Sequence, residues 1–168
     1  MLIVTGPVGV GKTTVAHEVA RLSRPSGVPY AVVDIDALAG SYPPPPGDGF
    51  NARMAFRNLA AVWRNYADAG VRRLILAYVF ENRRELEPVS EAVPGAELTV
   101  VRLHASHGAL RERVAGRERG SGREWHLHRA VELADLMDRE RVEDHLVHTD
   151  GRNVVEVARD VAEKAGWI

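Results

Sequence analysis

The residues best suited to chemistry lie at the amino terminus, where residues 6–13 read GPVGVGKT. This segment matches the pattern G-x-x-x-x-G-K-[ST] at every fixed position. Its glycines allow a tight turn that directs successive backbone N–H groups at one anion, and the N-terminus of the following helix adds partial positive charge. We therefore interpret this segment as a phosphate-binding loop.

Two side chains of this loop have the chemistry to bind a polyphosphate and its metal ion. The motif places Lys12 to reach the β- and γ-phosphates of ATP and the Thr13 hydroxyl to ligate Mg²⁺. The chain has two lysines, Lys12 and Lys164, so the lysine at the motif position is hard to attribute to chance. The sequence thus predicts that ATP and Mg²⁺ bind here, with nucleotide contacts from Gly6, Pro7, Val8, Gly9, Val10, Gly11, Lys12, Thr13 and Thr14.

The elements on either side of the loop are those that the motif requires. Residues 2–4 form an apolar run typical of a strand, and residues 14–22 carry Val15, Val19 and Leu22 at helical spacing. A second strand over 30–33 ends in Asp34-Ile35-Asp36.

Asp34 and Asp36 are expected beside the phosphate loop, because ligands of an open parallel sheet bind at the carboxyl ends of its strands. Alternate spacing in extended chain points both side chains to one side, toward a substrate or metal. The alternative is that Asp36 caps a short helix over 36–39 and Asp34 is solvated.

The segment that follows is predicted to border the substrate. Residues 41–49, here called the proline loop, contain four consecutive prolines and form either a substrate gate or a plain surface connection. Asn51 is expected to cap a long helix that Gly70 closes. Arg53 and Arg57 in its first turns either hold an anionic substrate or face solvent.

The third strand, over 72–80, is apolar enough to be a buried parallel strand. Its end lacks the acid of a second magnesium-binding element, since Ala77 and Tyr78 occupy that place. Either Glu81 takes the place of this acid as a metal ligand or Asp34 binds the metal, and we prefer Asp34. Arg83, which opens the next short helix, is a further candidate substrate contact.

A fourth strand over 97–104 leads to a helix over 110–119 and the segment Gly120-Ser121-Gly122. Arg113 and Arg117 share one face of this helix. An arginine-bearing lid, over about 108–125, suits phosphoryl transfer, because charge develops on the transferring oxygens and water must be excluded. An ordinary salt-bridged helix is the alternative.

In the carboxyl-terminal part, the sequence predicts a helix over 125–142 and a fifth strand over 145–148. A last helix is expected to open with the capping-box pattern of Asn153 and Glu156. The turn between this strand and the last helix is expected to border the purine of the nucleotide, through Thr149, Asp150 and Gly151.

Composition narrows the class of protein. The 168 residues fit one α/β domain over 1–168, and a net charge of −1 argues against a broad nucleic-acid or membrane surface. The absence of cysteine excludes disulfides and cysteine-based metal or redox sites, and no apolar run is long enough to span a bilayer. The chain starts directly in a strand, so we expect a cytoplasmic protein. We further expect either a monomer or a homodimer.

Together these features resemble the small P-loop kinases, which include shikimate, gluconate and adenylylsulfate kinases and chloramphenicol phosphotransferase. The resemblance implies a three-layer α/β fold whose five-stranded parallel sheet has the order 2-3-1-4-5, with helices on both faces. In this family the carboxylate after strand two meets the substrate hydroxyl, which corresponds to Asp36. The lid arginine lies over the adenine or the phosphates, which corresponds to Arg113 or Arg117.

The function predicted from the sequence is transfer of the γ-phosphoryl group of ATP to a hydroxyl of a small molecule, with Lys12, Asp36, Arg113 and Arg117 as catalytic residues. One alternative is an ATP-binding module or bare NTPase without an acceptor. Another is a nucleotide or polynucleotide 5′-end kinase, against which the near-neutral charge argues.

Overall fold

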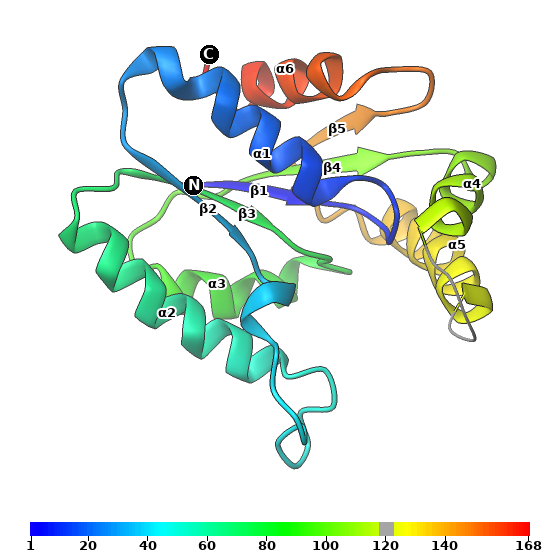
Figure 1. The fold of residues 1–168 in the computed structure, drawn as a ribbon, viewed down its shortest axis with the longest axis horizontal. Helices are drawn as coiled ribbons and strands as arrows, with labels where there is room; N and C mark the ends of the chain where they lie inside the picture. The colour runs from blue at the N-terminus through cyan, green and yellow to red at the C-terminus, as the bar shows by residue number, and fades with distance from the viewer. Residues whose placement is uncertain (118–122) are drawn as a thin grey trace.

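A single parallel sheet forms the centre of the structure, a computed structural model that describes residues 1–117 and 123–168 and only the backbone of Arg117 and Arg123. The strand order is β2-β3-β1-β4-β5, which confirms the predicted order (Figure 1). All four neighbouring pairs are parallel. The strands are β1 (Leu2–Thr5), β2 (Tyr30–Asp34), β3 (Arg73–Ala77), β4 (Thr99–His104) and β5 (His145–His148).

Helices cover both faces of the sheet and complete the three predicted layers. In Figure 1, α1 and α6 lie on one face and α2 and α3 on the other, while α4 and α5 lie toward the carboxyl ends of the strands. The α-helices are α1 (Lys12–Ser23), α2 (Ala52–Asp68), α3 (Glu87–Ala92), α4 (His107–Arg117), α5 (Arg123–Glu140) and α6 (Val154–Lys164). Short 3₁₀ helices are η1 (Arg24–Ser26), η2 (Asp36–Leu38) and η3 (Arg83–Leu86).

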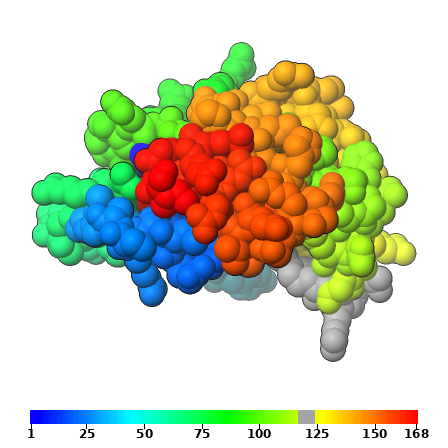
Figure 2. All heavy atoms as spheres, turned by 90° about the horizontal axis from the view of Figure 1, so that it is seen from above, coloured from blue at the N-terminus to red at the C-terminus, as the bar shows by residue number. Residues whose placement is uncertain are grey.

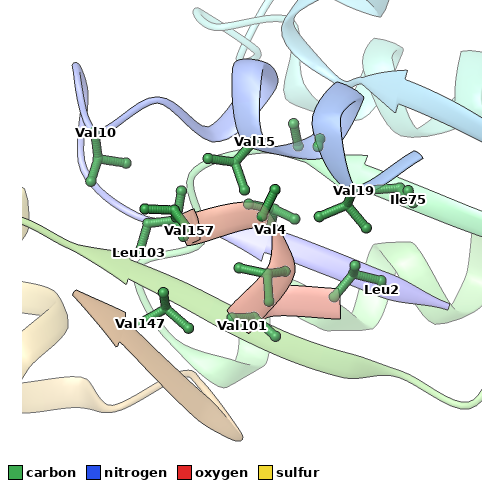
Figure 3. Close-up of a cluster of buried hydrophobic side chains, with 14 of the residues drawn as sticks. Leu2, Val4, Val10, Val15, Val19, Ile75, Val101, Leu103, Val147 and Val157 are labelled. Carbon is green, nitrogen blue, oxygen red and sulfur yellow. The ribbon is translucent and has the colours of Figure 1, made fainter. Parts of the chain in front are cut away.

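The first core lies between the sheet and the pair α1 and α6. Successive residues of a strand point to opposite faces, so Leu2 and Val4 of β1 enter this core while Ile3 does not. Figure 2 shows α6 beside α1 across this face. The contacting side chains drawn in Figure 3 include Val15 and Val19 of α1, Val157 of α6 and Val101 of β4.

The second core lies on the opposite face. There Ile3, Leu76 and Val100 of the sheet pack with Leu59 of α2 and Val89 of α3, all of them buried. Because both faces of each central strand are covered, apolar residues occupy both faces of β1, β3 and β4 rather than alternating with polar ones, with Arg102 of β4 as an exception.

The third strand is shorter than predicted and ends at Ala77 rather than at residue 80. Its last ladder partners are Val4 of β1 and Asp34, the residue at which β2 ends. Beyond Ala77 the chain is anchored by Phe80, whose amide donates to Thr5 Oγ1 over 3.0 Å and whose ring is fully buried in the second core. The apolar residues that suggested a strand are therefore core residues of a loop.

The predicted capping role of Asn51 is wrong. Asn51 stands at the N-cap position of α2 with a positive φ of 55°, but its side chain makes no cap bond. Its Nδ2 donates instead to the carbonyls of Ala39 and Ser41 over 2.7 and 3.0 Å, which ties down the start of the proline loop. At α6, by contrast, the predicted capping box of Asn153 and Glu156 is confirmed.

Arg102 carries a buried charge in the middle of β4, where its side chain is only 3% exposed. Its guanidinium donates to both carboxylate oxygens of Glu143, over 2.9 and 3.0 Å, and to Asp138 over 2.7 Å. A charge inside a protein is tolerated only with partners of this kind. The network joins β4 to α5 and to the segment before β5.

Replacement of this arginine tests the network. Arg102→Met is expected to lower the free energy of unfolding by about 3 kcal/mol, because the carboxylate of Glu143 would remain buried without its counter-charge. Urea unfolding measures the change. The matched control is Arg21→Met, which removes an exposed ion pair with Glu18 on α1 and should leave the urea midpoint unchanged. Equal midpoints for the two variants would contradict the assigned role.

Candidate functional site

The phosphate loop connects β1 to α1 and is seated tightly against the neighbouring elements. Gly6 and Gly9 have φ angles of 144° and 82°, which favour glycine. A Cβ at Gly6 would lie 2.6 Å from the Leu103 carbonyl oxygen of β4, and one at Gly9 would lie 2.5 Å from Val114 Cγ2 of α4. The two glycines are therefore required both by backbone angle and by close packing.

The predicted metal ligands lie together at the end of the loop. Thr13 Oγ1 donates to Asp34 Oδ2 over 2.6 Å, and Asp34 Oδ1 accepts the amide of Asp36 over 3.0 Å. Hydroxyl and carboxylate oxygens suit Mg²⁺, which takes few protein ligands and completes its shell with water and phosphate oxygens. Within residues 1–117 and 123–168, no group of three or more His, Cys, Asp or Glu side chains is arranged to hold a metal ion.

Lys12 begins α1 and folds back over the phosphate loop. Its Nζ donates to the Pro7 carbonyl oxygen over 3.2 Å. The ammonium group is thus held at the loop itself, where the motif predicts that it meets the phosphates of a nucleotide.

A cavity of about 1170 Å³ opens beside the loop. Its lining unites residues from the loop, β2, η2 and α2 that the sequence singled out separately. These are Val8, Gly9, Gly11, Lys12, Thr13, Thr14, Asp34, Asp36, Arg53 and Arg57.

Asp36 faces this cavity from the start of η2. The N-cap position of η2 belongs to Ile35, and no side chain caps the helix, so the capping alternative for Asp36 is not what the structure adopts. Asp36 lies close enough to Tyr78 to affect its titration. Burial is the main cause that raises the pKa of Tyr78, and the negative charge of Asp36 raises it further.

Arg113 lies at the junction between the phosphate loop and the turn after β5. Its guanidinium donates to Thr149 Oγ1 over 2.9 Å, to the Thr149 carbonyl over 3.3 Å and to the Val10 carbonyl over 3.4 Å. The turn is itself tied to the end of β4, because Asp150 Oδ2 accepts the Ser106 amide over 2.8 Å. Gly151 completes the turn with a φ of 68°.

The remainder of the predicted lid is only partly described. Its centre, 118–122, lies outside the described residues, and so does the side chain of Arg117.

Arg83 is placed away from the cavity lining. Its guanidinium pairs with Asp144 Oδ1 over 2.5 Å, which joins η3 to the start of β5. Burial alone would raise the pKa of Asp144, but the bonds from the Val100 amide and from Arg83 outweigh it and lower that pKa. The structure therefore does not bring Arg83 together with the other predicted substrate residues.

Sequence reasoning missed several polar residues that line the cavity, among them Tyr78, Glu85 and Arg129. Arg129 of α5 pairs with Glu81, which precedes it by 48 residues, and with Glu132. A pair so distant in the chain leaves no periodic pattern. Tyr78 was assigned to the third strand, and nothing in the sequence singled out Glu85.

The metal site can be tested by removing one carboxylate. Asp34→Asn is expected to reduce the Mg²⁺-dependent gain in nucleotide affinity about tenfold, since the carboxylate charge is lost while the shape is kept. Calorimetric titration of ATP with Mg²⁺ and with EDTA measures the gain. Asp68→Asn, at the exposed end of α2, is the matched control and should keep the wild-type gain. An undiminished gain in Asp34→Asn would exclude this carboxylate from the metal site.

No helix in the described part of the chain is long and apolar enough to cross a membrane.

Neither a protein-family model nor a curated protein sequence matches the chain. Solved structures do match it over nearly its whole length. A gluconokinase from Sinorhizobium meliloti 1021 is 22% identical with a TM-score of 0.62, and the match covers 98% of this chain and 90% of that protein. The tunicamycin resistance protein of Deinococcus radiodurans is 20% identical with a TM-score of 0.68, covering 98% and 95%.

A shikimate kinase from Acinetobacter baumannii, solved in complex with shikimate, is 19% identical with a TM-score of 0.60, covering 96% and 90%. These likenesses concern the arrangement of the chain in space. The chain therefore has the fold of the small P-loop kinases, the family that its sequence resembles.

Proposed function

We propose that the protein transfers the γ-phosphoryl group of ATP to a hydroxyl group of a small molecule. The observation that carries this proposal is the shared cavity, in which Lys12, the Thr13–Asp34 pair and Asp36 lie together. A nucleotide-binding module needs the loop alone, whereas this cavity continues past the loop into a space of acceptor size. The likeness in fold to a gluconokinase and a shikimate kinase supports the same reading.

The chain's own residues divide the work as follows. Lys12 and the loop N–H groups neutralise the phosphates, and Thr13 with Asp34 would hold the metal ion. When bound, Mg²⁺ supplies further positive charge to the β- and γ-phosphates. Asp36 orients or deprotonates the acceptor hydroxyl. The oxygen of that hydroxyl then forms a bond to the γ-phosphorus. The bond between that phosphorus and the bridging oxygen breaks, and ADP leaves.

The choice of Asp34 over Glu81 as the metal carboxylate is supported by their partners. Glu81 is paired with the guanidinium of Arg129, which competes with a cation for its oxygens. Asp34 instead accepts the hydroxyl of Thr13, the other predicted ligand. The hydroxyl of Thr13 can rotate so that its proton points away from a bound cation. The guanidinium charge of Arg129 would instead repel a cation next to Glu81.

The lid arginines are assigned to the nucleotide. The bonds from Arg113 to Thr149 and Val10 support a place at the purine side of the phosphate loop, where Thr149, Asp150 and Gly151 would border the base. Arg117, four residues along the same helix, is retained as the second candidate for contact with the transferring group.

Loss of the loop lysine should abolish the function at its first step. Lys12→Ala is expected to weaken binding of Mg-ATP by at least about tenfold and to remove ADP release, because the phosphates lose their direct ammonium contact. Calorimetry and a coupled ADP assay provide the two measurements. Lys164→Ala, at the exposed end of α6, is the matched control and should behave as wild type. Wild-type protein with no affinity for ATP or ADP in the presence of Mg²⁺ would refute the proposal.

Loss of the Asp36 charge should separate binding from transfer. Asp36→Asn is expected to bind Mg-ATP as wild type does and to transfer at least about a hundredfold more slowly, since general-base catalysis contributes roughly that much. The assay is ADP release over a panel of hydroxyl-bearing metabolites, with Lys12→Ala as the blank and Asp68→Asn as the control. Undiminished turnover in Asp36→Asn would remove this residue from the mechanism.

A further inference from the structure

Beyond the phosphate loop, the cavity is walled by aromatic rings. Phe56 of α2 lies edge to face with Tyr78, with ring centroids 5.9 Å apart, and Tyr78 lies edge to face with Phe80 at 5.2 Å. Phe50 and Trp125 also line the cavity and are 82% and 56% exposed. The total volume of about 1170 Å³ exceeds the 300–1000 Å³ or so of common small-molecule sites. An acceptor with an apolar body fits such walls.

The charge next to these rings is negative. Glu85 accepts hydrogen bonds from the Glu81 amide over 2.8 Å and from Asn82 Nδ2 over 3.0 Å, both of which are neutral donors. Burial is the main cause that raises the pKa of Glu85 and the charge of Glu81 adds to it, while the hydrogen bonds from the Glu81 amide and from Asn82 and the charge of Arg129 offset part of the rise. After burial, the charges of Asp36 and Glu85 are the next largest causes that raise the pKa of Tyr78. Asp36, Glu81 and Glu85 thus line the same cavity as Tyr78.

The described arginines that line the cavity either have acidic partners already or face solvent. Arg129, whose side chain is 28% exposed, is already engaged by Glu81 and Glu132. Arg53 and Arg57 are exposed on α2, where water and salt screen their charges, and Arg53 donates to a carbonyl of the proline loop. Among the described residues, an anion next to the aromatic rings would therefore meet carboxylates before it met an arginine without an acidic partner.

We propose that the acceptor is an alcohol that carries an amine and an apolar body, with its ammonium group held between Glu85 and the Phe56 and Tyr78 rings while its hydroxyl reaches Asp36. This inference rests on the proposed function, whose acceptor it specifies. A carboxylate and an aromatic face attract the same cation, and both attractions grow in a cavity partly shielded from water.

The first test measures binding, so that it does not depend on turnover. Three probes share a phenyl ring and a hydroxyl and differ in charge: phenylalaninol, N-acetylphenylalaninol and 3-phenyllactic acid. Each is titrated into the protein saturated with Mg²⁺ and a non-hydrolysable ATP analogue. Phenylalaninol is expected to bind at least about tenfold more tightly than the acetylated probe, and phenyllactic acid more weakly still. Equal binding, undetectable binding of all three, or preference for the acid overturns the proposal.

A variant pair then ties the preference to one carboxylate. Glu85→Gln retains an oxygen to accept the Glu81 amide but removes the charge, and it should bring phenylalaninol to the affinity of its acetylated form. Glu87→Gln, exposed on α3 and outside the cavity lining, is the matched control and should keep the preference. Mg-ATP affinity is measured for both variants and should equal that of wild type. A preference that survives Glu85→Gln overturns the assignment of the ammonium site.

ADP release with the same probes separates the two proposals. If phenylalaninol binds as expected but no acceptor stimulates ADP release, the phosphotransferase proposal fails and the amine site stands. If ADP is released and the acid is the better acceptor, the phosphotransferase proposal stands and the amine site fails.

Discussion

The close packing of the phosphate loop against β4 and α4 is the constraint on which the rest of the site depends. Gly6 and Gly9 leave no room for a side chain toward Leu103 and Val114, so the loop and these elements hold one another in place. With the loop fixed, α1 starts at Lys12 and presents Thr13 to Asp34 at the end of β2. The alignment of the two predicted metal ligands, Thr13 and Asp34, therefore depends on this packing.

Two arginines, one buried and one partly exposed, are paired in the same way. Arg102 in the core and Arg129 beside the cavity each engage two acidic side chains. In the core this arrangement offsets the cost of removing a charge from water. Beside the cavity it has a second effect, because an arginine already paired with Glu81 adds little attraction for an anion. Under the proposed function, pairs formed within the chain would set the selectivity for the acceptor.

Much of the fold was predictable because its signals are local. The motif at 6–13, the apolar runs and the capping box of Asn153 each depend on neighbours within a few residues, and all were found where expected. The predictions were wrong where a residue interacts with a segment that is distant in the chain. The apolar residues after Ala77 belong to a core loop, and Asn51 bonds to carbonyls ten and twelve residues earlier instead of capping α2.

The sequence by itself determined the phosphate-loop motif, its predicted chemistry toward ATP and Mg²⁺, and the succession of strands and helices along the chain, since spacing within one segment dictates each of these. Only the tertiary structure decided which charges enter the cavity. Arg83 is paired with Asp144, 61 residues away, and lies outside the cavity lining. Arg129 lines the cavity and is paired with Glu81. Such pairs depend on how separate elements meet in space, and a distance in space has no fixed counterpart in the spacing of residues along a chain.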